Sequence, residues 1–180
     1  ALTAALSDPP LSSEELLHRE RYLTPSQRRP LVWLPESETG FAPEAGCDAV
    51  ADTSFGELGL GVWLVEHGSS EAVAAVAADG WDADRAWLLD CPRGAALAWL
   101  VQLDGASDAR ELQAAAAGSG FDRIERHGRR VLISSGLEAA GRAYLLERLD
   151  EKRYDSLAAL LRDRPDILER AAEQRDDEAR

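Results

Sequence analysis

Apolar and polar positions alternate most clearly between residues 80 and 103. Two runs rich in Leu, Val and Trp, residues 85–91 and 96–103, are separated by the sequence Pro-Arg-Gly-Ala. Proline presets one turn dihedral and glycine supplies a permissive one, so the stretch predicts a tight antiparallel hairpin. The alternation predicts that one face carries Trp87, Leu89, Trp99 and Val101. The nearly continuous apolar character of both runs also indicates that both faces are at least partly covered.

Helical patterns precede this hairpin. In residues 54–66 the apolar positions recur at helical spacing, with further large side chains widening the face. Three glycines lower the helix propensity of this segment, and close packing against a neighbouring element would explain them. Ser69 or Ser70 is expected to cap a second helix that stops at Gly80. The predicted inward positions of the first helix are Phe55, Leu58, Val62 and Val65, widened by Leu60, Trp63 and Leu64.

A second hairpin and two more helices follow. Ser107 is expected to cap a helix over residues 108–118. A turn at His127-Gly128 separates two strands whose inward positions are Ile124, Val131 and Ile133, and a helix follows over residues 137–150. The order of elements predicts an α+β domain, with an antiparallel four-stranded sheet of two hairpins and helices packed on one face.

The patterns at the two ends of the chain predict other structures than the core. Residues 1–53 are predicted to hold a short helix, begun by Ser12 or Ser13, and a proline-rich extended segment that covers the core. Residues 54–150 form the predicted core domain, and residues 151–180 form a helical tail. The tail is either a helix hairpin packed on the domain or a docking element for another protein chain. Its apolar stripe consists of Leu157, Leu160, Leu161, Ile167 and Leu168.

The composition excludes several classes of function. The formal net charge is -13, which argues against non-specific nucleic-acid binding and against a polybasic membrane anchor. No apolar run approaches the length of a transmembrane helix. Cys47 and Cys91 can form one disulfide or remain two buried thiols. Because the sequence starts at Ala1, we expect that a signal or a larger N-terminal part was removed, or that the chain is a piece of a longer protein.

No motif for catalysis or cofactor binding is present. The three histidines are far apart in the sequence and form no HExxH pattern, and no GxSxG occurs. Asp82 and Asp84 flank a predicted strand start and are expected to cap turns. The sequence therefore assigns no catalytic residue, no metal ligand and no cofactor. It does suggest a small-ligand pocket between the hairpin and the helix at residues 54–66, lined by Trp63, Trp87 and Trp99.

Several short motifs are spread over about residues 5–137. They are Asp8-Pro9-Pro10, Ser12-Ser13-Glu14, Leu17-His18, Glu20-Arg21-Tyr22-Leu23, Gly56-Glu57-Leu58-Gly59, Gly80-Trp81-Asp82 with Asp84-Arg85, residues 97–103, and Ser107-Asp108-Ala109-Arg110-Glu111. In this order and spacing the chain resembles a family of poorly characterised bacterial and haloarchaeal secreted or surface proteins. Arg19 stands where that family usually has a proline, and longer members are expected to carry a zinc-peptidase-like region upstream. The resemblance implies an exported protein and assigns no catalytic residue here.

Three hypotheses about function follow. The first is an exported, periplasmic or extracellular, non-catalytic module that binds a partner or supports an assembly, with the C-terminal helices as the contact for another chain. The second is the C-terminal part of a metallopeptidase-like enzyme whose metal site lies upstream of Ala1. The third is a small-ligand binding domain that uses the tryptophan pocket.

Overall fold

The computed structural model describes residues 10, 12, 15, 17–18, 20, 23–24, 29–35 and 46–168. The chain divides into two units. Residues 33–152 form one, called here the sheet unit, and residues 1–32 with 153–180 form the other. Most of the short helix expected before residue 24 lies outside the described residues, as do the last twelve residues of the tail.

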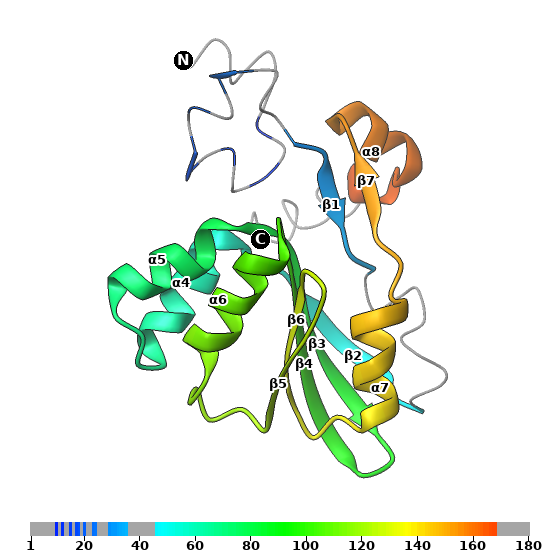
Figure 1. Ribbon diagram of the computed structural model, residues 1–180. Helices are drawn as coiled ribbons and strands as arrows, with labels where there is room; N and C mark the ends of the chain where they lie inside the picture. Colours follow the sequence, from blue (N-terminus) through cyan, green and yellow to red (C-terminus); the bar gives the residue numbers. More distant parts are fainter. Residues whose placement is uncertain are drawn as a thin grey trace, which may run out of the picture. The chain divides into compact units, whose positions relative to one another are not determined.

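The sheet unit holds one antiparallel sheet of five strands in the order β2-β3-β4-β6-β5 (Figure 1). Its elements alternate between helices and hairpins along the chain, as the sequence predicts. They are β2 (Asp48–Thr53), α4 (Gly56–Glu66), α5 (Glu71–Asp79), β3 (Trp81–Cys91), β4 (Gly94–Leu103), α6 (Ala106–Ala116), β5 (Arg123–His127), β6 (Arg130–Ser135), α7 (Ala139–Ala143) and the π-helical turn η4 (Tyr144–Arg148).

The prediction of a four-stranded sheet is wrong by one strand. The additional strand is β2, which pairs antiparallel with β3 from Asp48 opposite Asp90 to Thr53 opposite Ala86. Its sequence, DAVADT, has little apolar content, and most of its residues are exposed. An edge strand needs only one hydrogen-bonded neighbour, so pairing with the long β3 can form it without a strong hydrophobic pattern of its own. Part of the segment predicted to cover the core is therefore an edge strand of the sheet.

The central hairpin is confirmed, but its faces are not those predicted. Cys91 pairs with Gly94 across a two-residue turn, so Ala86 lies opposite Trp99 and Trp87 lies opposite Ala98. Directly opposed residues share a face, and successive residues alternate between faces. Trp87 and Leu89 consequently lie on one face of the sheet, whereas Trp99 and Val101 lie on the other. With an even number of turn residues, odd-numbered residues of one strand pair with even-numbered residues of the other, so Trp87 and Trp99 cannot share a face.

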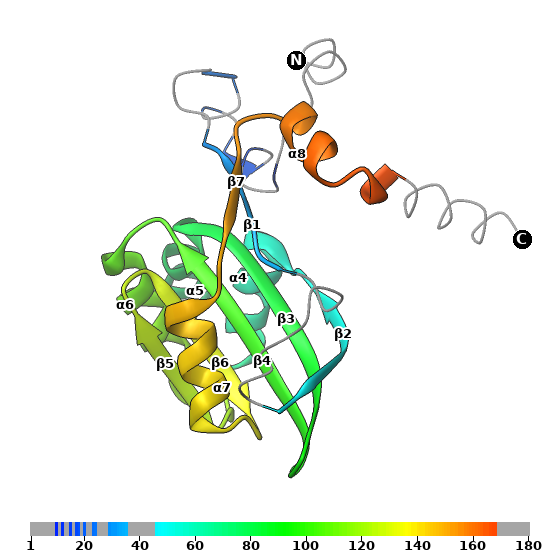
Figure 2. The ribbon, with the colours of Figure 1, turned by 90° about the vertical axis from the view of Figure 1, so that its right-hand side faces the viewer.

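Helices cover both faces of the sheet, which corrects the prediction of a single covered face. Figure 1 shows α4, α5 and α6 on one side of the sheet and α7 on the other, and the turned view in Figure 2 agrees. Leu145 and Leu146, at the turn η4 that continues α7, are buried. The long apolar strands β3 and β4 need this two-sided cover, because both of their faces carry large hydrophobic side chains.

The main hydrophobic core lies between the sheet and helices α4–α6. Trp99, Val101, Val131 and Ile133 contribute to it from the strands, and Leu60, Leu64 and Leu112 contribute from the helices. The inward positions predicted for the second hairpin are confirmed, because Val131 and Ile133 are buried and Ile124 packs against the cluster.

In the sheet unit, two helix starts were predicted from serines, and one of them is confirmed. The Ser70 hydroxyl accepts a hydrogen bond from the Val73 N–H, and α5 ends at Gly80. At α6 the N-cap is Gly105, and the Ser107 hydroxyl instead donates to the Asp108 carboxylate.

Three short described elements lie in the second unit or at its boundary with the sheet unit. Strand β1 (Leu31–Trp33), within the segment expected to be extended, pairs with β7 (Lys152–Tyr154) in a separate two-stranded sheet. Helix α8 (Leu157–Asp163) starts at Ser156, whose hydroxyl accepts from the Ala159 N–H.

Candidate functional site

A pocket of about 630 Å³ opens between α4 and the β2–β3–β4 end of the sheet. Its walls come from α4, from strands β2, β3 and β4, and from the segment that leads into β5. Most of the lining side chains are aromatic or aliphatic, so the pocket favours apolar groups. The lining residues are Ala51, Asp52, Thr53, Phe55, Gly59, Val62, Trp63, Glu66, His67, Ala86, Trp87, Leu88, Leu97, Trp99 and Phe121.

Four aromatic rings meet in this pocket at steep angles. The Trp99 ring lies 5.0 Å from Phe55 with an interplanar angle of 66°, and 5.1 Å from Trp63 with an angle of 88°. Trp63 lies 5.8 Å from Phe121 at 67°. Edge-to-face contacts at these distances are favourable and hold the rings in place. Rings at such angles form adjoining walls instead of a stack.

The structure brings together the three tryptophans that the sequence suggested for a pocket, but they do not contribute alike. The indoles of Trp63 and Trp99 pack against each other on the helix-covered face. The register places the side chain of Trp87 on the opposite face of the sheet, so Trp87 lines the pocket with its backbone. The sequence analysis did not predict Phe55 and Phe121 as lining residues. Phe55 directly precedes α4, and Phe121 lies in the connection between α6 and β5, so both are aromatic residues next to predicted elements of the core.

Behind the aromatic wall lies a buried carboxylate, that of Asp84 on β3. It sits at the N-terminus of α4 and accepts two hydrogen bonds from tryptophan indoles and three from the start of the helix. Asp84 was predicted to cap a turn. It instead caps the start of α4 and also binds the indoles of Trp81 and Trp99. The donors to Oδ1 are the Ser54 hydroxyl at 2.8 Å, Gly56 N at 2.9 Å and Trp81 Nε1 at 3.1 Å, and those to Oδ2 are Phe55 N at 2.9 Å and Trp99 Nε1 at 2.8 Å.

Every one of these partners of Asp84 is a donor, and none is a cation. A group surrounded by five donors acts as an acceptor only, which is the role of an ionised carboxylate. Its charge also complements the positive end of the α4 dipole. The carboxylate is thus neutralised by oriented N–H and O–H groups and by a helix terminus.

The far end of α4 supplies the polar rim of the pocket. His67 Nδ1 lies 2.8 Å from the backbone oxygen of Trp63, and the imidazole packs 4.7 Å from the Trp63 ring. A carbonyl oxygen can only accept, so Nδ1 of His67 donates in this contact. Glu66 is exposed beside it, and the last turn of α4 contains no basic residue. Glu66 therefore gives the rim a negative charge.

The outer face of α4 is apolar and exposed. The positions predicted to point inward, Phe55, Leu58, Val62 and Val65, are 52%, 64%, 55% and 38% exposed, so this prediction is wrong. The buried positions are instead those that seemed only to widen the face, Leu60 and Leu64. We call the four exposed residues the α4 stripe. Because Phe55 and Val62 also line the pocket, the stripe and the pocket form one apolar surface.

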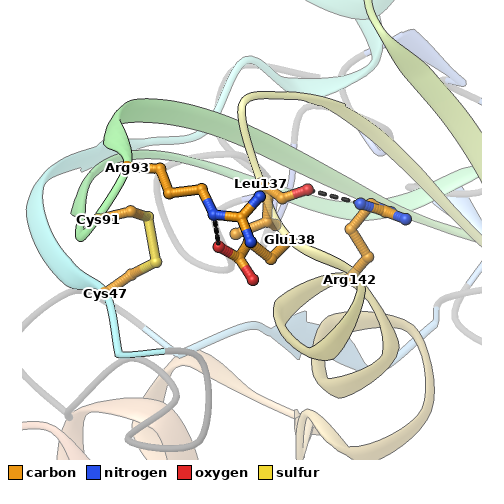
Figure 3. The surroundings of a disulfide bond; sticks show 6 residues. All are labelled: Cys47, Cys91, Arg93, Leu137, Glu138 and Arg142. Carbon is orange, nitrogen blue, oxygen red and sulfur yellow. Dashed lines mark hydrogen bonds and ion pairs between the residues drawn. A yellow bond between two sulfur atoms is a disulfide. The ribbon is translucent and has the colours of Figure 1, made fainter.

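Cys47 and Cys91 form a disulfide, which confirms one of the two alternatives for these residues. Both cysteines are buried. The bond joins the start of β2 to the end of β3, next to the hairpin turn (Figure 3). On the same turn, Arg93 reaches Glu138 at the start of α7 with an Nε–Oε1 distance of 2.6 Å. The disulfide thus fixes the edge strand that forms one wall of the pocket.

A second pocket, of about 460 Å³, is polar and lies between β5, β6 and α7. Its lining includes Arg123, Ser134 and Arg142. The guanidinium of Arg142 is already engaged, since it donates to Glu125 and to the backbone oxygen of Leu137, each at 2.5 Å. The aromatic pocket is therefore the stronger candidate for a ligand site.

The tail residues predicted to dock another chain lie in and after α8. Leu160 is buried, Leu161 and Ile167 are half-buried, and Leu157 and Leu168 are exposed. Near them, the Tyr154 hydroxyl donates to Asp163 Oδ2 at 2.5 Å. Burial and this hydrogen bond raise the pKa of Tyr154 to about 12. That the tail binds a partner stays a prediction.

Comparison with protein-family models, with curated proteins and with solved structures gave no significant match. Among the helices that the structure describes, none has the length and the apolar character needed to cross a bilayer.

Proposed function

We propose that the protein is a non-catalytic binding module whose ligand places an apolar group in the aromatic pocket. The observation that carries the proposal is the pocket itself, with Phe55, Trp63, Trp99 and Phe121 on its walls. Its volume of about 630 Å³ falls within the range of small-molecule sites. Apolar walls with a polar rim are typical of sites that bind and orient a ligand.

Binding is testable with a neutral fluorescent probe, N-phenyl-1-naphthylamine. Two of the pocket walls are tryptophans, so a bound probe should quench tryptophan emission while its own emission rises and shifts to the blue. We expect saturable binding with one site per chain. A linear, unsaturated signal would contradict the proposal.

A matched pair of variants locates the site on edge strand β2. Ala51 is exposed and lines the pocket, so Ala51→Trp should fill it and abolish probe binding. Val50 is its neighbour, is 63% exposed and does not line the pocket, so Val50→Trp should bind the probe like the unmodified protein. Equal loss in both variants, or in neither, would place the probe elsewhere.

The α4 stripe favours a second candidate, the docking of another protein. Exposed apolar surface that continues into a pocket is typical of protein interaction sites. Leu58 and Val65 have no role in the pocket, so Leu58→Ser with Val65→Ser should leave probe binding intact. If the stripe is an interface, the same double variant should lose its partner in pull-down from the native source.

The disulfide supports export, because stable disulfides form mainly in oxidising compartments. The test is the intact mass of the protein from its own source, with and without reductant. A gain of about two hydrogens on reduction supports an exported chain, whereas free thiols in the untreated protein would contradict it. The alternative of a metallopeptidase-like enzyme predicts a metal site upstream of Ala1, and an HExxH motif upstream in the gene would favour it.

A further inference from the structure

Among the described residues that line the aromatic pocket, the acidic ones are Asp52 and Glu66. Glu66 stands at the rim without a cationic partner among the described residues, and Asp52 is balanced by Arg85, whose Nη1 lies 2.8 Å from Asp52 Oδ1. Apart from His67, no basic side chain of the described part of the chain lines the pocket. The chain as a whole carries a formal charge of -13, which attracts cations toward its surface.

The helix α4 adds to this negative potential. Its N-terminal positive end is capped by the Asp84 carboxylate, which accepts from Phe55 N and Gly56 N. Its C-terminal end, the negative end of the dipole, lies at Glu66 and His67 on the pocket rim and has no basic residue in its last turn. The C-terminal end of the helix thus favours a positive charge at the pocket rim.

The aromatic rings are arranged to use such a charge. The Trp99 indole donates its N–H to the buried carboxylate of Asp84 at 2.8 Å, and this contact increases the electron density of the ring. A cation is attracted to the face of an electron-rich ring, most of all to tryptophan. Trp63 stands at 88° to Trp99 and Phe55 at 66°, so the rings bound a corner with walls on several sides.

We propose that this pocket binds a quaternary ammonium cation that carries an apolar body. A quaternary ammonium has no N–H donor, so the apolar lining leaves no hydrogen bond unmade. A primary ammonium carries three donors, which would need acceptors that the aromatic walls do not offer. The apolar body occupies the sheet side of the pocket and the charge lies between the rings and Glu66. This inference rests on the proposed function, since it names the ligand class of the same site.

The test compares two molecules of the same shape. Benzyltrimethylammonium and 2,2-dimethylpropylbenzene differ in one atom, the charged nitrogen of the first being a carbon in the second. Titrations at low ionic strength, followed by tryptophan fluorescence and by displacement of N-phenyl-1-naphthylamine, give both dissociation constants. We expect the cation to bind at least roughly tenfold more tightly, and added salt to weaken only the cation.

Two glutamate variants separate the local charge from the overall charge. Glu66→Gln should weaken cation binding by roughly threefold or more and leave the neutral molecule unchanged. Glu71→Gln, at an exposed position of α5 outside the pocket lining, removes the same overall charge and should change neither constant. Equal affinity for the two molecules would overturn the inference while the proposed function stands. Failure of both molecules and of the naphthylamine to bind would overturn both.

Discussion

The substitution Asp84→Asn replaces one carboxylate oxygen by an amide group at a position where the structure has only donors. Oδ1 of Asp84 accepts three hydrogen bonds and Oδ2 accepts two, from Phe55 N and Trp99 Nε1. The amide of asparagine costs least where it replaces Oδ2. There its N–H groups face two donors, so two hydrogen bonds are lost.

The size of the effect depends on whether the two donors can find another partner. Phe55 is 52% exposed, so water can reach its backbone N–H. Trp99 is 3% exposed, so its indole N–H remains buried and unsatisfied. A buried polar group without a partner costs about 1–3 kcal/mol, and charge-assisted bonds lie at the upper end. We therefore expect Asp84→Asn to lower the free energy of unfolding by about 3 kcal/mol, a large share of the 5–15 kcal/mol typical of a domain.

Urea unfolding at pH 7, followed by tryptophan fluorescence of the oxidised protein, measures this difference. The control is Asp90→Asn on the same strand, where the side chain is exposed; its effect should stay within about 0.5 kcal/mol. A loss of less than about 1 kcal/mol for Asp84→Asn would refute the reasoning, because it would mean that the carboxylate does not satisfy these donors.

Three further predictions concern other parts of the chain. Reduction of Cys47–Cys91, which spans 44 residues, should lower the free energy of unfolding by about 2–4 kcal/mol in urea titrations with and without reductant. Because the folded pKa of Tyr154 is raised from 10.0 to about 12, its contribution to stability is complete below pH 10 and is lost between pH 10 and pH 12; absorbance titration of Asp163→Asn should show a lower midpoint. Val62 is 55% exposed, so Val62→Lys should change the free energy of unfolding by less than about 0.5 kcal/mol, which the same urea assay checks.

The parts of the fold that follow from local rules could be predicted. The hairpin turn at Pro92 and Arg93 and the turn after His127 are fixed by residues within the turns themselves, and both occur where expected. The cap at Ser70 is equally local. Which face of the hairpin carries Trp87 also follows from the sequence, once the even number of turn residues is counted.

Other features depend on partners distant in the sequence. Strand β2 forms by pairing with the edge of β3, and the disulfide holds its start against the end of β3. The inward face of α4 could not be chosen from its own pattern, since apolar residues surround the helix. A Cβ added to Gly61 would lie 3.9 Å from the Ala78 methyl group, an ordinary contact distance, so this position faces α5.

The orientation of α4 also explains why its apolar stripe is exposed. Asp84 holds the first turn of the helix by its backbone N–H groups and holds Trp99 by its indole, so the start of α4 and the aromatic wall share one anchor. With the first turn fixed, Leu60 and Leu64 face the core, and the helical repeat then forces Leu58 and Val62 outward. Exposed apolar patches favour aggregation unless they form a binding surface. The binding function proposed here therefore accounts for the exposed apolar residues of α4, because they line the pocket or lie beside it.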